Sequence, residues 1–153
     1  MPTITPFLWF DDNAEEAIAF YISIFKDGKI LDEHRHDDGK LFFGSFQIHG
    51  QKLMALNGGP DFKFTEAISL FVDCDTQEEV DYLWDKLVEG GRPVQCGWLQ
   101  DKYGLFWQII PSALGELLGD PDPEKSGRVM QAMLKMVKID VEGLRRAYEN
   151  RAG

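Results

Sequence analysis

"LWFDDNAEEAIAFYISIFKDGKI" (residues 8–30) and "FVDCDTQEEVDYLWDKLVEGGRP" (71–93) align without a gap, and this internal repeat decides the fold. Each copy starts as a short apolar strand and continues with apolar residues at helical spacing. A capping box begins at Asn13 and at Thr76, each with a Glu three positions later. Gly28 and Gly90-Gly91 end the two helices as left-handed caps. The repeat therefore predicts two copies of one strand–helix unit.

Further apolar segments follow each helix and predict strands. They span 30–35, 41–48 and 53–57 in the first copy, with a His49-Gly50 turn, and 94–100 and 105–110 in the second. Each unit is then a strand, a helix and two or three antiparallel strands. This arrangement predicts an α+β fold whose paired sheets curve around a shared cavity.

The stretch "CGWLQDKYGLFWQIIP" (96–111) predicts a hairpin whose turn runs from Asp101 to Gly104, because glycine takes a positive φ easily. Gln108 then lies in an apolar strand, on one face with Phe106 and Ile110. Two interpretations are open: Gln108 points into a cavity, or it is a core amide bonded to the backbone.

After residue 111 the sequence pattern predicts helices instead of strands. Ser112 is predicted to cap a short helix that runs through Leu118, and a second helix is predicted from Pro123, a residue favoured at a helix start, to about Tyr148. The second helix has a Met-rich apolar face, and methionine packs adaptably. It could pack on its own domain, form a dimer contact, or act as a lid over the cavity. The predicted divisions are 1–60, 66–111 and a helical extension 112–153, within a single compact fold.

Composition excludes several classes of partner. The 153 residues suit one compact domain, and a formal charge of −10 disfavours nucleic acid and anionic membranes. There is no apolar run of roughly 18 residues and no signal-peptide pattern, so we expect a cytoplasmic protein. The two cysteines, Cys74 and Cys96, have no metal-binding spacing, and we expect reduced thiols.

Four stretches together resemble a known family: 8–21, "LNGGPDFKFTEAISLFVDC" (56–74), 96–111 and "RVMQAMLKMVKID" (128–140). They are similar to the PhnB-like subgroup of the vicinal oxygen chelate superfamily, which includes glyoxalase I, extradiol dioxygenases and bleomycin-resistance proteins. The subgroup often bears the label 3-demethylubiquinone-9 3-methyltransferase. The resemblance implies two βαβββ modules that form a curved mixed sheet around a U-shaped cavity, usually in a homodimer.

The superfamily's chemistry implies a divalent metal held by His and Glu, two ligands from each module. By this resemblance the ligand positions fall near Pro6, Met54 and Ser69 and at Gln108. Such metals need imidazole nitrogen or carboxylate oxygen, which none of these residues supplies. We therefore expect no metal and no cofactor, with Gln108 in the place of a ligating Glu.

The methyltransferase label finds no motif to support it. An S-adenosylmethionine site uses a glycine-rich loop between a parallel strand and a helix. The close glycines here, "NGGP" (57–60) and "EGGRP" (89–93), fit a turn and a helix cap.

Other candidate residues have plainer interpretations. His34 and His36 could pair on a metal, but their charged surroundings favour a solvated edge strand. His49 fits a turn. Cys96 would need a neighbouring base to act as a nucleophile, and the sequence names none.

The expected function is the binding of a small apolar or aromatic molecule without a metal. The expected binding residues are Gln108, Phe106, Met54, Trp98, Asn57 and Glu66, and the remaining aromatic candidates are Trp9, Phe46 and Trp107. Glu66 is either a candidate general base or part of a solvated linker. The alternatives are an enzyme of the glyoxalase/dioxygenase superfamily, metal-dependent or acid–base through Glu66 and Gln108, and a methyltransferase. No catalytic residue is assigned.

Overall fold

The computed structural model describes residues 1–151, and the chain divides into two compact units, Met1–Phe64 and Thr65–Gly153. Each unit contains a four-stranded mixed sheet. The predicted α+β class is confirmed, and each unit is one copy of a βαβββ module. No helix within residues 1–151 combines the length and apolarity needed to cross a membrane.

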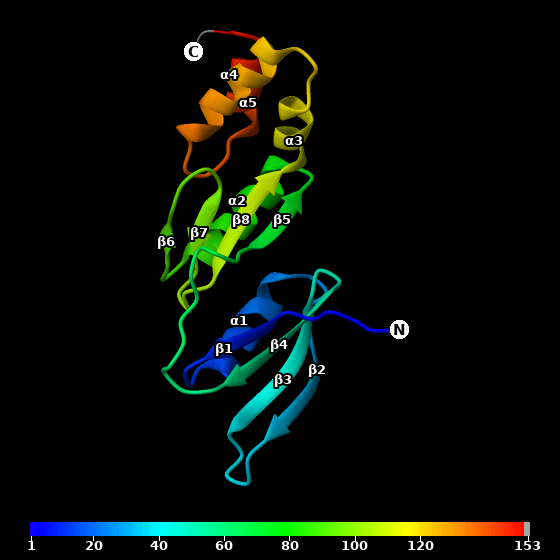
Figure 1. The fold of residues 1–153 in the computed structure, drawn as a ribbon, viewed down its shortest axis with the longest axis vertical. Coiled ribbons are helices and arrows are strands. Elements are labelled where there is room, and N and C mark those ends of the chain that lie inside the picture. The colour runs from blue at the N-terminus through cyan, green and yellow to red at the C-terminus, as the bar shows by residue number, and fades with distance from the viewer. Residues whose placement is uncertain (152–153) are drawn as a thin grey trace. The chain divides into compact units, whose positions relative to one another are not determined.

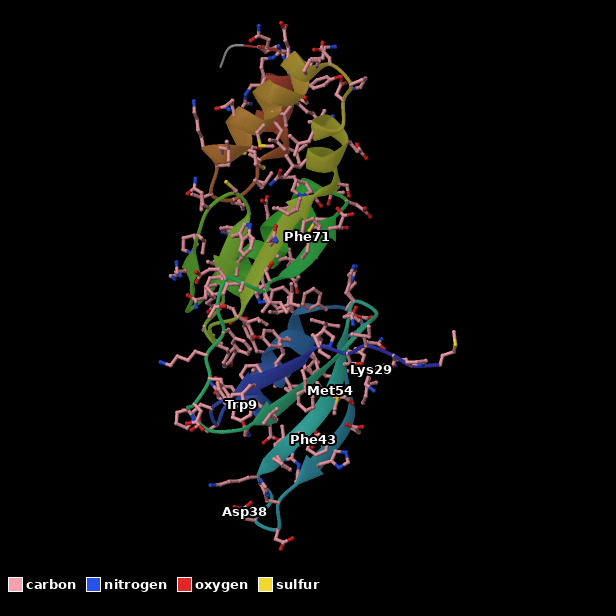
Figure 2. The ribbon with its side chains drawn as sticks, in the orientation of Figure 1. Trp9, Lys29, Asp38, Phe43, Met54 and Phe71 are labelled. Atoms are coloured by element: carbon pink, nitrogen blue, oxygen red, sulfur yellow. The ribbon has the colours of Figure 1, made fainter. Side chains whose placement is uncertain are left out.

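Unit 1 follows the predicted order of elements. Its elements are β1 (Phe7–Phe10), α1 (Ala14–Ile24), β2 (Lys29–Arg35), β3 (Leu41–Ile48) and β4 (Gln51–Asn57). The sheet order is β1-β4-β3-β2, in which β1 runs parallel to β4 and the other pairs are antiparallel (Figure 1). Alternation along β1 and β4 sends Leu8, Phe10 and Ala55 to a buried face. The opposite face carries Trp9, Phe43 and Met54, which are half-buried (Figure 2).

The start and end of α1 differ from the capping pattern in the sequence. The side chain of Asn13 makes no capping hydrogen bond, and its backbone (φ −116°, ψ 24°) is not extended as an N-cap usually is. Asn57, at the end of β4, caps the helix instead: its Oδ1 accepts from the Ala14 N–H at 2.8 Å. Gly28 is not left-handed; a Cβ there would lie 2.2 Å from the Ile22 carbonyl oxygen, so close approach explains this glycine.

Unit 2 repeats the module. Its sheet elements and helix are β5 (Leu70–Cys74), α2 (Gln77–Val88), β6 (Arg92–Pro93), β7 (Trp98–Gln100) and β8 (Phe106–Pro111). The sheet order is β5-β8-β7-β6, with β5 parallel to β8. At the start of α2 the predicted Thr76 cap is present, since Thr76 Oγ1 accepts from the Glu79 N–H at 3.2 Å. Glu79 in turn accepts at 2.9 Å from the N–H of Asp75, one residue before the cap.

The predicted strand 94–100 is wrong, because the chain folds back within it. β6 and β7 are antiparallel neighbours joined by a turn in which Cys96 and Gly97 both have positive φ, +56° and +86°. The left-handed conformation costs a non-glycine residue energy and ends an extended strand. The bend could not be predicted from the sequence, because cysteine is not a residue type that favours a positive φ.

The hairpin of β7 and β8 is confirmed and is held by a buried carboxylate. Asp101, only 2% exposed, accepts from the N–H groups of Tyr103 and Leu105 at 2.9 and 3.1 Å through Oδ1. Its Oδ2 accepts from the indole N–H of Trp107 at 2.9 Å. Trp107 is therefore a core residue that points away from the strand face of Gln108.

Three helices complete unit 2: α3 (Ser112–Leu118), α4 (Pro123–Leu134) and α5 (Val141–Tyr148). α3 ends at Leu118 as predicted, but Ser112 is its first residue rather than its cap, and the Ser112 hydroxyl donates to Asp73 instead. The long tail helix is wrong, because residues 135–140 form a connector between α4 and α5. The carbonyls of Met136 and Val137 leave the helical pattern and accept from the N–H groups of Cys96 and Gly97 at 2.9 and 2.7 Å. The connector is thus bonded to the β6–β7 turn.

The extension packs on its own unit. Ile110 at the end of β8 forms one buried cluster with Leu114, Val129, Ile139 and Leu144. Figure 1 shows α3 continuing from the end of β8, with α4 and α5 beside it. The Met-rich face is therefore partly core, since Met133 and Met136 pack against this cluster, while Met130 is exposed.

Candidate functional site

A cavity of about 730 Å³ lies in unit 2, on the sheet face opposite α2. Strand alternation explains its floor. In register, Phe71 pairs with Gln108, Trp98 pairs with Gln108 from the other side, and Asp73 pairs with Ile110. Paired residues share a sheet face, so these five side chains all line the cavity.

The helical extension supplies the walls. The lining residues from the end of β8, from α3 and from α4 are Pro111, Ser112, Leu114, Gly115, Glu116, Leu118 and Met133. Because α3 begins directly after β8, its side chains are placed at the edge of the sheet by chain continuity. A Cβ built at Gly115 meets nothing within 4 Å, so the helix leaves open space there.

The walls are mostly apolar, and part of this surface is open to solvent. Phe71, labelled in Figure 2, is 58% exposed, and Trp98 is half-buried. A large aromatic side chain left this exposed beside a concavity is characteristic of a binding surface rather than of a core.

Gln108 is part of the cavity wall and is bonded to Ser69, the residue that directly precedes β5. Its Nε2 donates to Ser69 Oγ at 3.0 Å, a side-chain partner rather than a backbone one. With Nε2 used in this bond, the amide still has its oxygen, Oε1, as a hydrogen-bond acceptor.

Asp73 joins the sheet to α3. Ser112 Oγ donates to Asp73 Oδ1 at 2.8 Å, which orients the carboxylate of this exposed residue at the rim of the cavity. Oδ1 thus has a partner within the structure, and Oδ2 is a second acceptor on the same carboxylate.

The two cysteines have different environments. Cys96 is half-buried and lines the cavity, but the lining residues include no His, Lys or Arg that could serve as its base. Cys74 is buried, and burial, with the charges of Glu79, Asp73 and Asp75, raises the pKa of its thiol to about 11. Cys74 is therefore an inert thiol at neutral pH.

Of the six expected binding residues, the cavity brings together Gln108 and Trp98. Phe106 shares the strand face of Gln108 but is 1% exposed, with the Arg92 guanidinium 5.8 Å from its ring centre, and it does not line the cavity. Glu66 is exposed in a turn.

The other two expected residues belong to unit 1. Met54 is half-buried on β4, and Asn57 has structural partners, because it caps α1 and its Nδ2 donates to the Leu41 carbonyl at 3.0 Å. Two further aromatic candidates are structural as well. Trp9 donates from its indole N–H to the Gly59 carbonyl at 2.9 Å, and Phe46 is fully buried.

The four positions expected to hold a metal form two hydrogen-bonded pairs, one in each unit, but their side chains are not suited to bind a metal ion. The Met54 N–H donates to the Pro6 carbonyl at 2.9 Å in unit 1, and Gln108 donates to Ser69 in unit 2. Within residues 1–151, no group of three or more His, Cys, Asp or Glu side chains is placed to hold a metal ion. The side chains at the four positions, a proline ring, a thioether, a hydroxyl and an amide, are not a donor set for the divalent ions of this superfamily.

His34 lies on an exposed edge strand, β2, and His36 lies directly after the end of that strand. The His34 ring stacks on Phe43 with 4.2 Å between ring centres, and His36 lies 4.9 Å from Phe42. Every residue of β2 is exposed. The plainer interpretation, a solvated edge strand, agrees with this placement.

Sequence reasoning missed most of the cavity. Phe71 and Asp73 alternate within β5, a signal that they share a face, but Leu114 and Met133 reach the cavity only through helix packing. The local sequence of the tail shows an amphipathic helix and does not show what it encloses.

Comparison with known proteins agrees with this architecture. The family model described as 3-demethylubiquinone-9 3-methyltransferase matches residues 2–110. The match ends before α3, so the extension lies beyond it, whereas the resemblance in the sequence includes part of the tail. No curated protein matches the sequence significantly.

Several solved structures are similar to this chain. A PhnB protein of Bacillus cereus bearing the same methyltransferase description is 35% identical with a TM-score of 0.68, over 72% of this chain and 99% of that one. Protein PA1353 of Pseudomonas aeruginosa is 20% identical with a TM-score of 0.63, over 72% and 98% of the two chains. A glyoxylase/bleomycin resistance protein/dioxygenase domain of Frankia sp. EAN1pec is 16% identical with a TM-score of 0.49, over 72% and 92%.

The match over residues 2–110, the Bacillus cereus relative and the two βαβββ units agree with one another. The chain therefore belongs to the PhnB-like family whose model is described as 3-demethylubiquinone-9 3-methyltransferase.

Proposed function

We propose that the cavity of unit 2 binds a small apolar or aromatic molecule without the help of a metal. The observation that carries this proposal is the open cavity itself, about 730 Å³ and walled mainly by apolar side chains. Ligand pockets in proteins typically have volumes of roughly 300–1,000 Å³ and combine apolar walls with a few polar groups.

The lining residues would make different kinds of contact with the ligand. Phe71 and Trp98 offer ring faces for an aromatic ligand, and Leu114 and Met133 offer apolar contact from the helices. Gln108, held by Ser69, supplies a fixed acceptor that orients the ligand. Burial of apolar surface would provide the affinity, and the polar groups would provide selectivity.

Methyl transfer has no comparable support. The β1–α1 and β5–α2 connections, residues 11–13 and 75–76, contain no glycine. A cofactor with a nucleoside needs glycines at such a turn to approach the backbone. Acid–base catalysis through Glu66 and Gln108 also lacks support. Glu66 is exposed, and the side-chain amide of Gln108 forms hydrogen bonds but neither gains nor loses a proton near neutral pH.

A pair of glycine substitutions tests the proposal. Gly115→Leu places a side chain in the open space of the cavity, and Gly127→Leu places the same side chain on α4, where a Cβ also meets nothing within 4 Å. Both replace a helical glycine, so neither should lower the melting temperature.

The assay is a screen of small aromatic compounds by thermal shift, because a ligand of the folded state must stabilise it. We expect hits that raise the melting temperature of the wild type and of Gly127→Leu but not of Gly115→Leu. Equal shifts in Gly115→Leu would place binding elsewhere, and a screen without hits would count against the function.

The metal-free part of the proposal has its own test. We expect the melting temperature to be unchanged by a chelator or by added nickel, zinc, manganese or iron. Stoichiometric metal in the purified protein, or a chelator effect that metal reverses, would contradict it.

We also propose that the protein is a homodimer, and light scattering would test this oligomeric state.

A further inference from the structure

The charges that line the cavity of unit 2 are of one sign. Among its lining residues, Asp73 and Glu116 carry carboxylates, and no Lys, Arg or His lines it. Both acidic residues are exposed at the rim. A ligand entering the cavity therefore meets negative charge first.

The remaining polar groups add acceptors. Asp73 Oδ1 already accepts from Ser112, which holds the carboxylate in place at 2.8 Å and leaves Oδ2. Gln108 uses Nε2 as a donor to Ser69 and so presents Oε1. A ligand that complements these groups must itself donate hydrogen bonds or carry positive charge.

The aromatic walls favour the same charge. Phe71 is 58% exposed, so its ring face is available, and Trp98 lines the same floor. Ring faces are electron-rich and attract cations, most strongly for tryptophan. The formal charge of −10 of the whole chain adds a long-range attraction for cations.

We infer that the ligand of this cavity is an organic cation, an amine attached to an apolar or aromatic body. This inference rests on the proposed function and names its ligand class. The apolar body would lie against Leu114 and Met133, while the ammonium group would lie at the rim near Asp73 and Glu116. An aromatic anion of the same size would meet two carboxylates and no compensating charge.

Three probes with one ring system separate charge from shape: the cation 2-(1-naphthyl)ethylamine, the neutral 2-(1-naphthyl)ethanol and the anion 1-naphthaleneacetate. Isothermal titration calorimetry on the full chain would measure each dissociation constant at low salt and at about 0.5 M salt, where exposed charges are largely screened. We expect the amine to bind about fivefold more tightly than the alcohol, and the acetate to bind most weakly. Added salt should reduce the preference for the amine.

Matched variants locate the effect. Asp73→Asn combined with Glu116→Gln keeps the size of both side chains, and the amide oxygen introduced at position 73 can still accept from Ser112. This double variant should lose most of the preference for the amine and keep only the part that comes from the ring faces and the net charge of the chain. Asp85→Asn, an exposed change on α2 across the sheet from the cavity, should keep the wild-type preference.

The outcomes separate the two proposals. If the alcohol binds as tightly as the amine in the wild type, the cavity binds small molecules but the cation inference is wrong. If the full preference survives in the double variant, Asp73 and Glu116 do not hold the ammonium group and the inference is also wrong. If no probe binds wild type at millimolar concentration while the protein is folded, the proposed function fails and the inference fails with it.

Discussion

Removing the carboxylate of Asp101 should destabilise unit 2 more than any other single loss of a hydrogen-bonding side chain described above. Its two oxygens accept three N–H groups, from Tyr103, Leu105 and the Trp107 indole. Asp101→Ala leaves these donors without that acceptor. Leu105 and Trp107 are 2% and 1% exposed, so water cannot easily replace it for them.

The expected cost follows from these three bonds. A buried donor left without a partner costs about 1–3 kcal/mol, and two such donors with one that water can reach give about 3–5 kcal/mol. Urea unfolding followed by circular dichroism would measure the free energy of unfolding. The loss should appear as a lower midpoint with an unchanged slope.

A matched control uses Asp38 in the turn between the antiparallel strands β2 and β3 of unit 1. Asp38, labelled in Figure 2, accepts from the Lys40 N–H at 2.9 Å but is exposed. Asp38→Ala should cost less than about 1 kcal/mol, since water replaces the lost acceptor. If the two substitutions cost the same, burial is not what makes the Asp101 bonds strong, and the reasoning is refuted. Because β7 and β8 carry Trp98 and Gln108, Asp101→Ala should also weaken ligand binding.

Three further predictions concern caps, turns and pH. Asn57→Ala should lower the free energy of unfolding by about 2 kcal/mol in urea, since it removes the acceptor at the α1 start and a donor to β3; a cost below about 0.5 kcal/mol, on the scale of an ordinary surface change, would contradict this role. Gly97→Ala should destabilise by about 2 kcal/mol or more, because φ is +86° and its Cβ would lie 2.6 Å from Ile110, whereas Gly39→Ala, at φ +88° with open space, should cost about 1 kcal/mol by thermal melts. The Tyr148 hydroxyl donates to Asp120 at 2.6 Å, which lowers the pKa of Asp120 and raises the pKa of Tyr148. The stability lost in Tyr148→Phe should therefore be full near pH 7, shrink as pH falls below about 4, the ordinary pKa of Asp, toward the lowered pKa of Asp120, and shrink again as pH rises above about 10, as urea titrations at about pH 3, 7 and 10.5 would show; a difference independent of pH would refute the pairing.

Much of the fold could be predicted because its signals are local. The repeat, the hairpin around Gly104 and the short helix from Ser112 to Leu118 depend on neighbours a few residues apart, and the structure has all three. The cap of α1 could not be predicted in this way. Asn13 has the expected residue type, but an acceptor from the distant Asn57 takes its place.

The tail and the cavity show the same limit. Residues 135–140 fit a continuing helix by composition, but the carbonyls of Met136 and Val137 bond to Cys96 and Gly97 instead. Gln108 can be recognised because a polar residue in an apolar strand is conspicuous. Leu114 cannot, since a leucine on an amphipathic helix looks the same whether it faces a core or a cavity.

The bonds between the α4–α5 connector and the β6–β7 turn also set an order of assembly during synthesis. All four strands of the unit 2 sheet leave the ribosome before the connector that pairs with Cys96 and Gly97. Until Ile139 and Leu144 emerge, Ile110 lacks part of its buried cluster and exposes apolar surface to solvent. Domains fold from the N-terminus as they are made, and such partly covered surfaces are sites of aggregation and of chaperone binding. The cavity thus reaches its final form only when the last helix has been made.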